Sequence, residues 1–306
     1  MNFKTSAIAL AVAGSVATPM AAQADVYASV RIGVESFDTG GVSDLRTRSY
    51  GSRFGVRGET DLGNGMTGFG RYEWDVDFLD HNEDADDDID IRHRYVGIKG
   101  GFGSLTIGHT YHTFYNHVVA PLDNPWWGSA EAYLNNDGRE DRGVTYAGRS
   151  GDITFGATAF FEREAGEDAI DELEVGLSFG IGDMTLGIAA QTTETTHGSA
   201  NNDDAIVGLA LHGISAGDVS MGFGVMLQDE DTGLVADFAF GSAYLHIEQL
   251  SKDATDADEL LLTLGYTQSL GRKTTAWYEV VSFDKDTGNS DDDETTLRAV
   301  LKYDIE

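Results

Sequence analysis

Three histidines lie close together in the chain, and imidazole groups at such a spacing could bind a metal. His109, His112 and His117 are the residues concerned. Zinc binding also requires a fixed geometry and a closed or deliberately open ligand shell, which this spacing does not supply. His93 and His246 have no accompanying nucleophile motif. We therefore expect hydrogen-bonded histidines, and the sequence predicts no metal centre, no cofactor and no enzyme.

Acidic side chains dominate the chain's charge. Asp and Glu number 52 against 20 Lys and Arg, and the formal net charge is −32. Nucleic acids and anionic headgroups call for basic patches, so they are not expected as partners. One interpretation is that the acids are solvated loop tips that keep the protein soluble. The other is a negative vestibule that attracts cations, because a cleft lined by charge of one sign concentrates counter-ions.

The acids form clusters in four stretches of the chain, 83–88, 162–174, 253–259 and 284–294. Carboxylate oxygens are ligands for Ca²⁺ and Mg²⁺, and residues 86–88 and 291–294 could hold these ions. No cluster has the twelve-residue ligand spacing of a dedicated calcium loop, so only weak, diffuse binding of these ions is expected.

The first 24 residues have the pattern of a secretory signal peptide. Lys4 precedes an apolar run at 7–16, and small residues lead to Ala22-Gln23-Ala24. Such a leader is removed after export. We assign residues 1–24 to the signal peptide and 25–306 to one mature domain. Zero cysteines exclude a disulfide-stapled secreted fold.

The mature chain alternates apolar and polar residues in short runs. In residues 25–35 the apolar side chains all fall on one face. About sixteen such runs follow one another, roughly 9–12 residues each, which is the length of a tilted membrane-spanning strand. No segment reaches the ~18 apolar residues of a spanning helix. An exported chain of this kind can enter a membrane only as a closed barrel.

The connections between the runs also alternate. Seven are short and rich in Gly, Asn, Asp and Ser, as in hairpin turns. Eight are mostly longer and acidic, at 36–47, 80–90, 110–141, 163–171, 194–204, 229–233, 252–258 and 285–294. Short turns at one rim and long loops at the other are typical of outer-membrane barrels. The sequence predicts an all-β fold, a 16-stranded antiparallel transmembrane β-barrel with a polar, water-filled lumen.

One connection, at 110–141, differs from the others. It contains two of the three prolines and Trp126-Trp127 in an apolar middle. An exposed loop rarely carries such residues unless they are covered. We expect this loop to fold into the lumen, pack on the wall and narrow the channel.

Three segments resemble the Gram-negative general-diffusion porins. Residues 52–74 are similar to their second hairpin, 94–116 to the strands that lead into the constriction loop, and 143–146 to the strand that follows it. The strong similarity covers about residues 50–150. The resemblance implies a homotrimer of sixteen-stranded barrels in the outer-membrane lipid. It also implies an eyelet in which basic residues on the wall face acids on the third loop.

Carried over by position, the resemblance gives Arg53, Arg92 and Arg139 as wall residues, with Arg142 as the alternative to Arg139. The alternation pattern places Arg53 and Arg57 opposite the apolar face. It also places Arg92 and Arg94 together on one face, and two guanidiniums facing lipid would cost several kcal/mol. All of these arginines are therefore expected in the lumen.

The resemblance also implies acids in the eyelet. Glu73 matches a lumen acid of the family, and Asp123 and Glu131 are the loop acids nearest the expected tip. Two departures stand out. The family's Pro-Glu-Phe-Gly-Gly-type tip is replaced by residues 122–128, and the chain ends in Glu306 instead of an aromatic residue.

These patterns together predict a passive channel for ions and small hydrophilic solutes. Cation selectivity is expected because the loop acids far outnumber the lumen arginines. One alternative is a substrate-specific channel in which Trp126 and Trp127 stack on a ligand. Another is a non-conducting adhesin or structural barrel whose acidic loops bind a partner.

Overall fold

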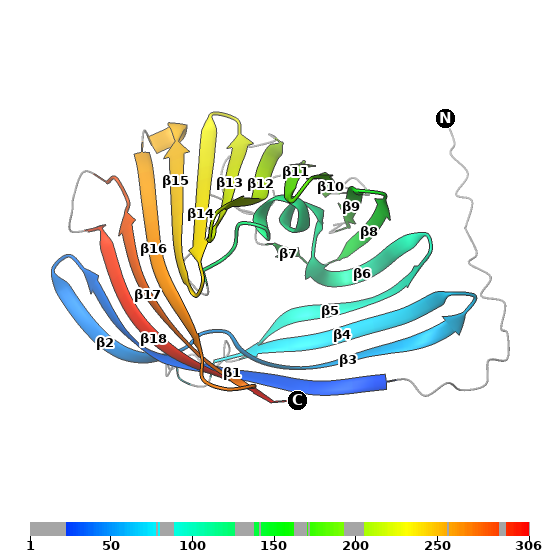
Figure 1. Ribbon diagram of the computed structural model, residues 1–306, viewed down its shortest axis with the longest axis horizontal. Helices are drawn as coiled ribbons and strands as arrows, with labels where there is room; N and C mark the ends of the chain where they lie inside the picture. Colours follow the sequence, from blue (N-terminus) through cyan, green and yellow to red (C-terminus); the bar gives the residue numbers. More distant parts are fainter. Residues whose placement is uncertain are drawn as a thin grey trace.

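The computed structural model describes residues 23–77, 79, 89–125, 138–140, 142–161, 170, 172–192, 205–255, 257–287 and 292–305. In these residues, antiparallel strands form one closed sheet around a central opening (Figure 1). The first strands are β1 (Gln23–Thr39), β2 (Val42–Ser49), β3 (Ser52–Gly63), β4 (Met66–Val76), β5 (Ile89–Gly100) and β6 (Gly103–Tyr111). Next come β7 (Arg139–Glu140), β8 (Gly143–Ser150), β9 (Ile153–Phe160), β10 (Glu172–Ile181), β11 (Met184–Gln191) and β12 (Ile206–Ala216). The last are β13 (Val219–Gln228), β14 (Asp231–Phe240), β15 (Ala243–Lys252), β16 (Ala257–Ser269), β17 (Thr274–Asp284) and β18 (Glu294–Ile305).

The described segments amount to sixteen strands, as predicted. β2 and β3 pair in succession with β1, and β7 and β8 pair in succession with β6. Each of these pairs is one strand with an interruption, so the eighteen labelled segments form sixteen strands. Pairing of β1 with β18 closes the ring, which removes every sheet edge that would otherwise expose unpaired backbone groups.

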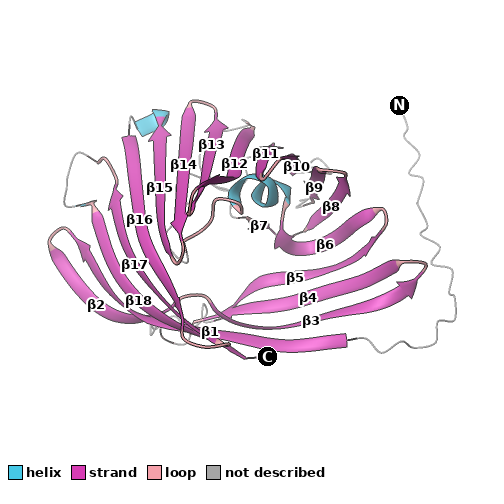
Figure 2. Ribbon diagram, in the orientation of Figure 1, coloured by secondary structure: helices cyan, strands magenta, loops and turns pink. Residues whose placement is uncertain are grey.

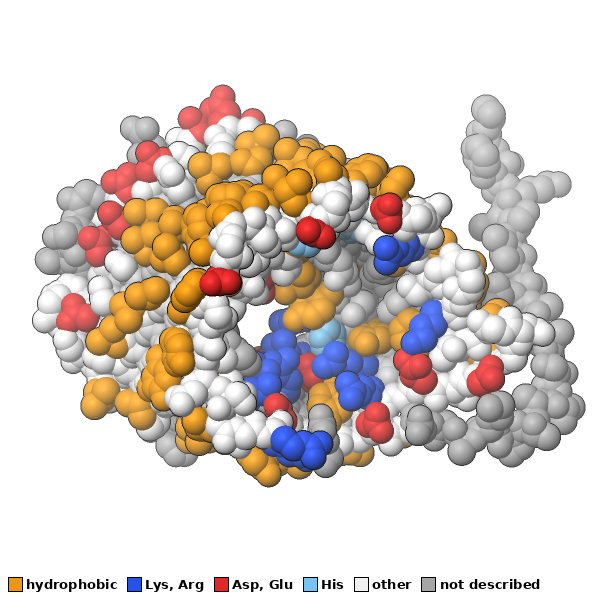
Figure 3. Space-filling model, viewed as in Figure 1, with side chains coloured by type: hydrophobic (Ala, Val, Ile, Leu, Met, Phe, Trp, Pro, Cys, Tyr) orange, Lys and Arg blue, Asp and Glu red, His pale blue; other side chains and the backbone are white. Residues whose placement is uncertain are grey.

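Period-two alternation decides which side chains face outward. On β10, Leu173, Val175 and Leu177 are exposed on the outer surface, whereas Glu174 between them is buried on the inner side. The apolar outer surface appears as extended orange areas in Figure 3. Such a surface suits contact with lipid, since successive side chains of a strand point to opposite faces.

The predicted connections between strands are confirmed at one rim of the barrel and partly wrong at the other. All seven predicted short turns connect strands at the rim where β1 begins and β18 ends. The predicted bounds of the connections at 36–47 and 229–233 are wrong, because adjacent strands extend into them. Gly40 and Gly41 have φ of 59° and 72°, which allows a two-residue hairpin turn, so the β1–β2 ladder continues to Thr39 and Val42. Asp229, with φ of 51°, similarly closes a tight turn between β13 and β14.

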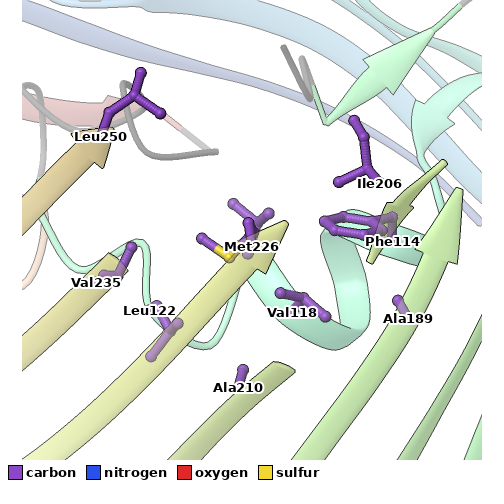
Figure 4. Packing of buried hydrophobic residues seen from close by; sticks show 10 residues of the cluster. Phe114, Val118, Leu122, Ala189, Ile206, Ala210, Met226, Val235 and Leu250 are labelled. Carbon is purple, nitrogen blue, oxygen red and sulfur yellow. The ribbon is translucent and has the colours of Figure 1, made fainter. Parts of the chain in front are cut away.

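The chain after β6 turns into the barrel. Residues 113–119 form a short helix that includes η1 (Tyr115–Val119), and it lies inside the ring of strands (Figure 2). A second short helix, η3 (Asp253–Thr255), follows β15. Phe114, Val118 and Leu122 pack against inward residues of β11 to β15 in a buried cluster (Figure 4). No helix in the described ranges is long and apolar enough to cross a membrane.

Candidate functional site: the lumen constriction

The wall of the constriction is built by β1, β3, β4 and β5. Arg53 on β3 lies directly opposite Asp75 on β4, and Glu73 lies opposite His93 on β5. Directly opposed residues of an antiparallel pair share a face. Since Phe54 and Val56 on β3 are exposed on the outer surface, their neighbours Arg53 and Arg57 face inward.

Glu73 is the centre of the wall's hydrogen-bond network. Its carboxylate is fully buried and accepts a hydrogen bond from the Tyr27 hydroxyl at 2.7 Å. The Arg92 Nε donates to it at 3.1 Å, and Arg71 forms a second close ion pair. The Arg53 Nη1 lies 3.9 Å from the same carboxylate. One buried acid therefore orients three guanidinium groups.

The wall carries more positive than negative groups at this level. Arg92 also donates to Asp75 at 3.2 Å. Arg31, two residues beyond the cross-strand partner of Arg53, lies on the same inward face of β1 and donates to Ser29 at 3.3 Å. In Figure 3, basic side chains gather on one wall of the opening. This wall is expected to hold anions near it and to repel cations.

Replacing Glu73 with Gln is expected to destabilise the barrel and increase anion preference. The change leaves three guanidiniums without their shared counter-charge, and breaking a buried ion pair typically costs about 3–5 kcal/mol. Thermal unfolding followed by gel mobility measures the first effect, and reversal potentials measure the second. Asp75→Asn is the matched control, because Asp75 is 30% exposed and forms one of the ion pairs described here. Equal effects of the two variants would contradict the central role of Glu73.

Across the lumen, the start of the in-folded loop is held by buried polar groups. Glu174 on β10 pairs with the His112 imidazole at 2.5 Å and accepts the Phe114 backbone N–H at 3.1 Å. The Thr113 backbone N–H donates to the Thr158 hydroxyl on β9 at 3.1 Å. These contacts fix the point at which the chain leaves the wall and enters the lumen.

The helix that follows continues this attachment. The His117 Nδ1 lies 2.6 Å from the Ser178 hydroxyl on β10. Burial lowers the pKa of His117, although the nearby Glu174 carboxylate opposes that shift. A neutral imidazole is suited to this site because it needs no buried counter-charge.

Two tyrosines connect the loop with Arg139 on β7. The Tyr115 ring stacks on Tyr111, with centroids 4.4 Å apart and planes within 8°. The Tyr115 hydroxyl donates to Asp123 at 3.0 Å, and burial together with the charge of Asp123 raises the pKa of the phenol. Arg139 donates to the Tyr111 hydroxyl at 2.9 Å, with its guanidinium over the ring. The predicted residues Asp123 and Arg139 thus lie on either side of one aromatic pair.

The structure brings some predicted site residues together and separates others. Arg53, Glu73 and Arg92 form one cluster. Arg57 faces inward but lies nearer the short turns, where it is 57% exposed and 3.7 Å from Asp25. Glu131 and the Trp126-Trp127 pair lie outside the described residues, so the role of Glu131 stays a prediction.

The prediction that Arg94 lines the lumen is wrong. The β4–β5 register shifts at Arg92, because Glu73 is opposite His93 while Trp74 is opposite Ile91. This β-bulge inserts one extra residue and reverses the alternation beyond it. Arg94 therefore shares the outward face with Tyr72 and Val96.

Sequence reasoning missed several members of the wall cluster. Tyr27, Arg31, Arg71 and Asp75 all face inward beside predicted residues. A signal for them was present, since Arg71, Glu73 and Asp75 alternate on one face of β4. Tyr27 and Arg31 likewise lie on the polar face of β1.

The clustered histidines do not assemble into a metal site in the described residues. His112 and His117 contact Glu174 and Ser178, and His109 lies opposite Arg94 on β5. Within the ranges given above, no group of three or more His, Cys, Asp or Glu is placed to hold a metal ion. Two acidic runs were expected to bind divalent cations weakly. Residues 86–88 lie outside those ranges, and of residues 291–294 only 292–294 lie within them.

The fold and the in-folded loop define a transmembrane β-barrel with a constricted lumen. Residues 7–306 match the model of a family described as Gram-negative porin. The chain belongs to this family, and it is an outer-membrane protein.

Two relatives and two solved structures illustrate the similarity. The major outer membrane protein P.IB of Neisseria meningitidis is 35% identical over 136 residues, 40% of this chain and 38% of that protein. Its counterpart in Neisseria gonorrhoeae is 34% identical over 116 residues, 34% of this chain and 31% of that protein. The chain's match thus spans less than two fifths of the length of these relatives.

An anion-selective porin from Comamonas acidovorans has a TM-score of 0.74 at 15% identity, over 93% of this chain and all of that one. OmpF of Salmonella typhi, in a complex with daunomycin, has a TM-score of 0.71 at 14% identity, over 92% of this chain and 97% of that one. At these identities the two structures establish the fold alone.

Proposed function

We propose that this protein is a passive channel for ions and small hydrophilic solutes across the outer membrane. The observation that carries the proposal is the helix of residues 113–119, which lies inside the ring of strands (Figure 2). The wall on the other side of the lumen carries Arg53 and Arg92. A loop that packs on one wall narrows the lumen and sets a size limit. The charged groups that line the remaining opening act on every ion that passes.

Reconstitution of the purified protein in a planar bilayer tests this function. Stepwise current increases with conductance proportional to bulk salt are expected for a water-filled channel. Insertion without conductance would favour an adhesin or structural barrel. Block by one solute that saturates with concentration would favour a substrate-specific channel.

The proposed selectivity is for cations, and it depends on two opposing charges. The net charge of −32 is expected to raise the cation concentration at the mouth. The arginine wall opposes this effect locally, within about 8–10 Å at physiological salt. We infer that the acids prevail at low salt because of their number. Anion preference in a dilute salt gradient would overturn this sign.

We also propose that the chain forms a homotrimer through the outer face of β3 to β6. Arg94 and His109 lie opposite each other on the outward side of this face. A guanidinium exposed to lipid near the bilayer centre costs about 2–4 kcal/mol. Nearer the short turns, Gly58, Gly68 and Gly70 line a hollow of about 630 Å³ on this face. Apolar side chains such as Val96 and Ile98 also line it. A neighbouring copy that covers this face would shield the charge and fill the hollow.

Replacing Arg94 with Leu is expected to lower the fraction of trimer in detergent. If a neighbouring subunit covers Arg94, the change removes a polar contact, whereas in lipid the same change would be stabilising. Unheated gel electrophoresis and light scattering measure the oligomer. Leu209→Ala, on the outward face of β12, is the control. A trimer that is unchanged or more stable in the Arg94 variant would contradict this interface.

A further inference from the structure

The inner wall under the loop consists of unusually small residues. One row of small residues crosses β9 to β12, and each member is the cross-strand partner of the next: Gly156, Gly176, Ala189 and Gly208. A second row crosses β11 to β13 through Gly187, Ala210 and Gly224. All of these positions share the inward face. We call the five glycines, Gly156, Gly176, Gly187, Gly208 and Gly224, the glycine track.

The loop helix occupies the space that side chains would take at these glycines. A Cβ atom on Gly176 would lie 2.5 Å from the His117 ring, and one on Gly208 would lie 2.7 Å from Phe114 and Val118. A Cβ on Gly187 would overlap the His117 carbonyl oxygen, and one on Gly224 would overlap the Leu122 side chain. At Gly156 the approach is less close, since a Cβ there would lie 3.0 Å from the Thr113 hydroxyl oxygen.

Glycine at these sites lowers the stability of the strands, and the packing of the loop against the wall must offset that loss. Glycine within a strand weakens it, and often marks a place where another backbone approaches closely. Here the approaching segment is residues 113–122, whose Phe114, Val118 and Leu122 are fully buried against the wall. Ala189 and Ala210, between the glycines, are also buried.

We propose that the glycine track sets the distance between the loop and the wall, and thereby the width of the narrowest part of the channel. A methyl group on the track cannot be accommodated without movement, because the sheet behind it is closed. The loop must therefore move toward the lumen. The glycines act as positioning residues, through the loop, and this inference rests on the proposed channel function.

Three single substitutions test the inference, Gly187→Ala, Gly208→Ala and Gly224→Ala. Each is expected to lower the single-channel conductance and the size limit for uncharged polymers, while thermal unfolding of the barrel changes little. The loss of conductance should be largest at Gly187, where the overlapped atom is the backbone carbonyl oxygen of His117, and smaller at Gly224, where it is the end of the flexible Leu122 side chain. Gly156→Ala, with its nearest contact at 3.0 Å, should have the smallest effect. Gly180→Ala is the matched control on β10, since its Cβ would meet its nearest neighbour at an ordinary 3.5 Å.

A compensating variant keeps the inference testable if one substitution disturbs folding. Leu122→Ala removes the side chain that a methyl on Gly224 would overlap, so the double variant with Gly224→Ala should recover conductance. Native conductance in all three single variants, or no recovery in the double variant, would overturn the role of the glycine track. An unmodified protein that does not conduct would instead overturn the proposed function.

Discussion

Replacing Val118 with Asp is expected to raise the single-channel conductance and to admit larger solutes. Val118 is fully buried between the loop helix and the wall, in the cluster with Phe114 and Leu122. A carboxylate without a partner in this cluster would cost several kcal/mol, so the loop is expected to leave the wall. The strands carry their own backbone hydrogen bonds, so the barrel should remain folded. Conductance and exclusion of uncharged polymers measure the change.

Ala120→Asp provides the matched control for the added charge. Ala120 follows the same helix but is exposed, so its carboxylate would enter the lumen without disturbing the packed face. This variant should change ion preference while the polymer size limit stays constant. If Val118→Asp and Ala120→Asp had the same size limit, the buried cluster could not be what holds the loop.

Neutralising Arg53 and Arg92 together is expected to shift the reversal potential toward cation preference. In a high-dielectric lumen, the electrostatic energy between one guanidinium and an ion that passes at ~4 Å is about 1 kcal/mol. The ratio of cation to anion permeability should therefore change several-fold. Glu73 keeps its contacts with Arg71 and Tyr27, so the double Gln variant retains a partnered acid. The shift should be smaller in 1 M salt, where the screening length is about 3 Å.

Arg57→Gln is the control for this double variant. Arg57 lies on the same strand and the same face as Arg53 but is 57% exposed and nearer the short turns. Its loss should have a smaller effect on the reversal potential. An unchanged reversal potential in the double variant would show that the acidic mouth alone governs permeation.

The general architecture follows from local sequence patterns. Alternation of apolar and polar residues decides the outward face of each strand, because successive side chains point to opposite sides. The Gly-, Asn- and Asp-rich turns separate the strands, so their number and antiparallel order are confirmed. The apolar middle of the third loop also predicted burial, and Val118 and Leu122 are buried in the lumen.

Other features depended on contacts that local patterns do not contain. Alternation carried past Arg92 places Arg94 in the lumen, whereas the bulge opposite Glu73 sends it outward. A bulge depends on how two strands pair, and no residue type in β5 predicts it. The extended hairpin at Gly40 and Gly41 likewise depends on pairing between β1 and β2.

The sequence alone therefore determined the barrel, its outer surface and the inward direction of Arg53 and Glu73. Only the tertiary structure decided that Glu73 joins Tyr27, Arg71 and Arg92, since these residues come from three strands. It also decided that the His117 carbonyl lies against Gly187, which the sequence marks only as a small residue in a strand. The physical reason is the same in both cases. Period-two alternation acts within one strand, whereas ion pairs and close packing form between residues that only the closed sheet brings together.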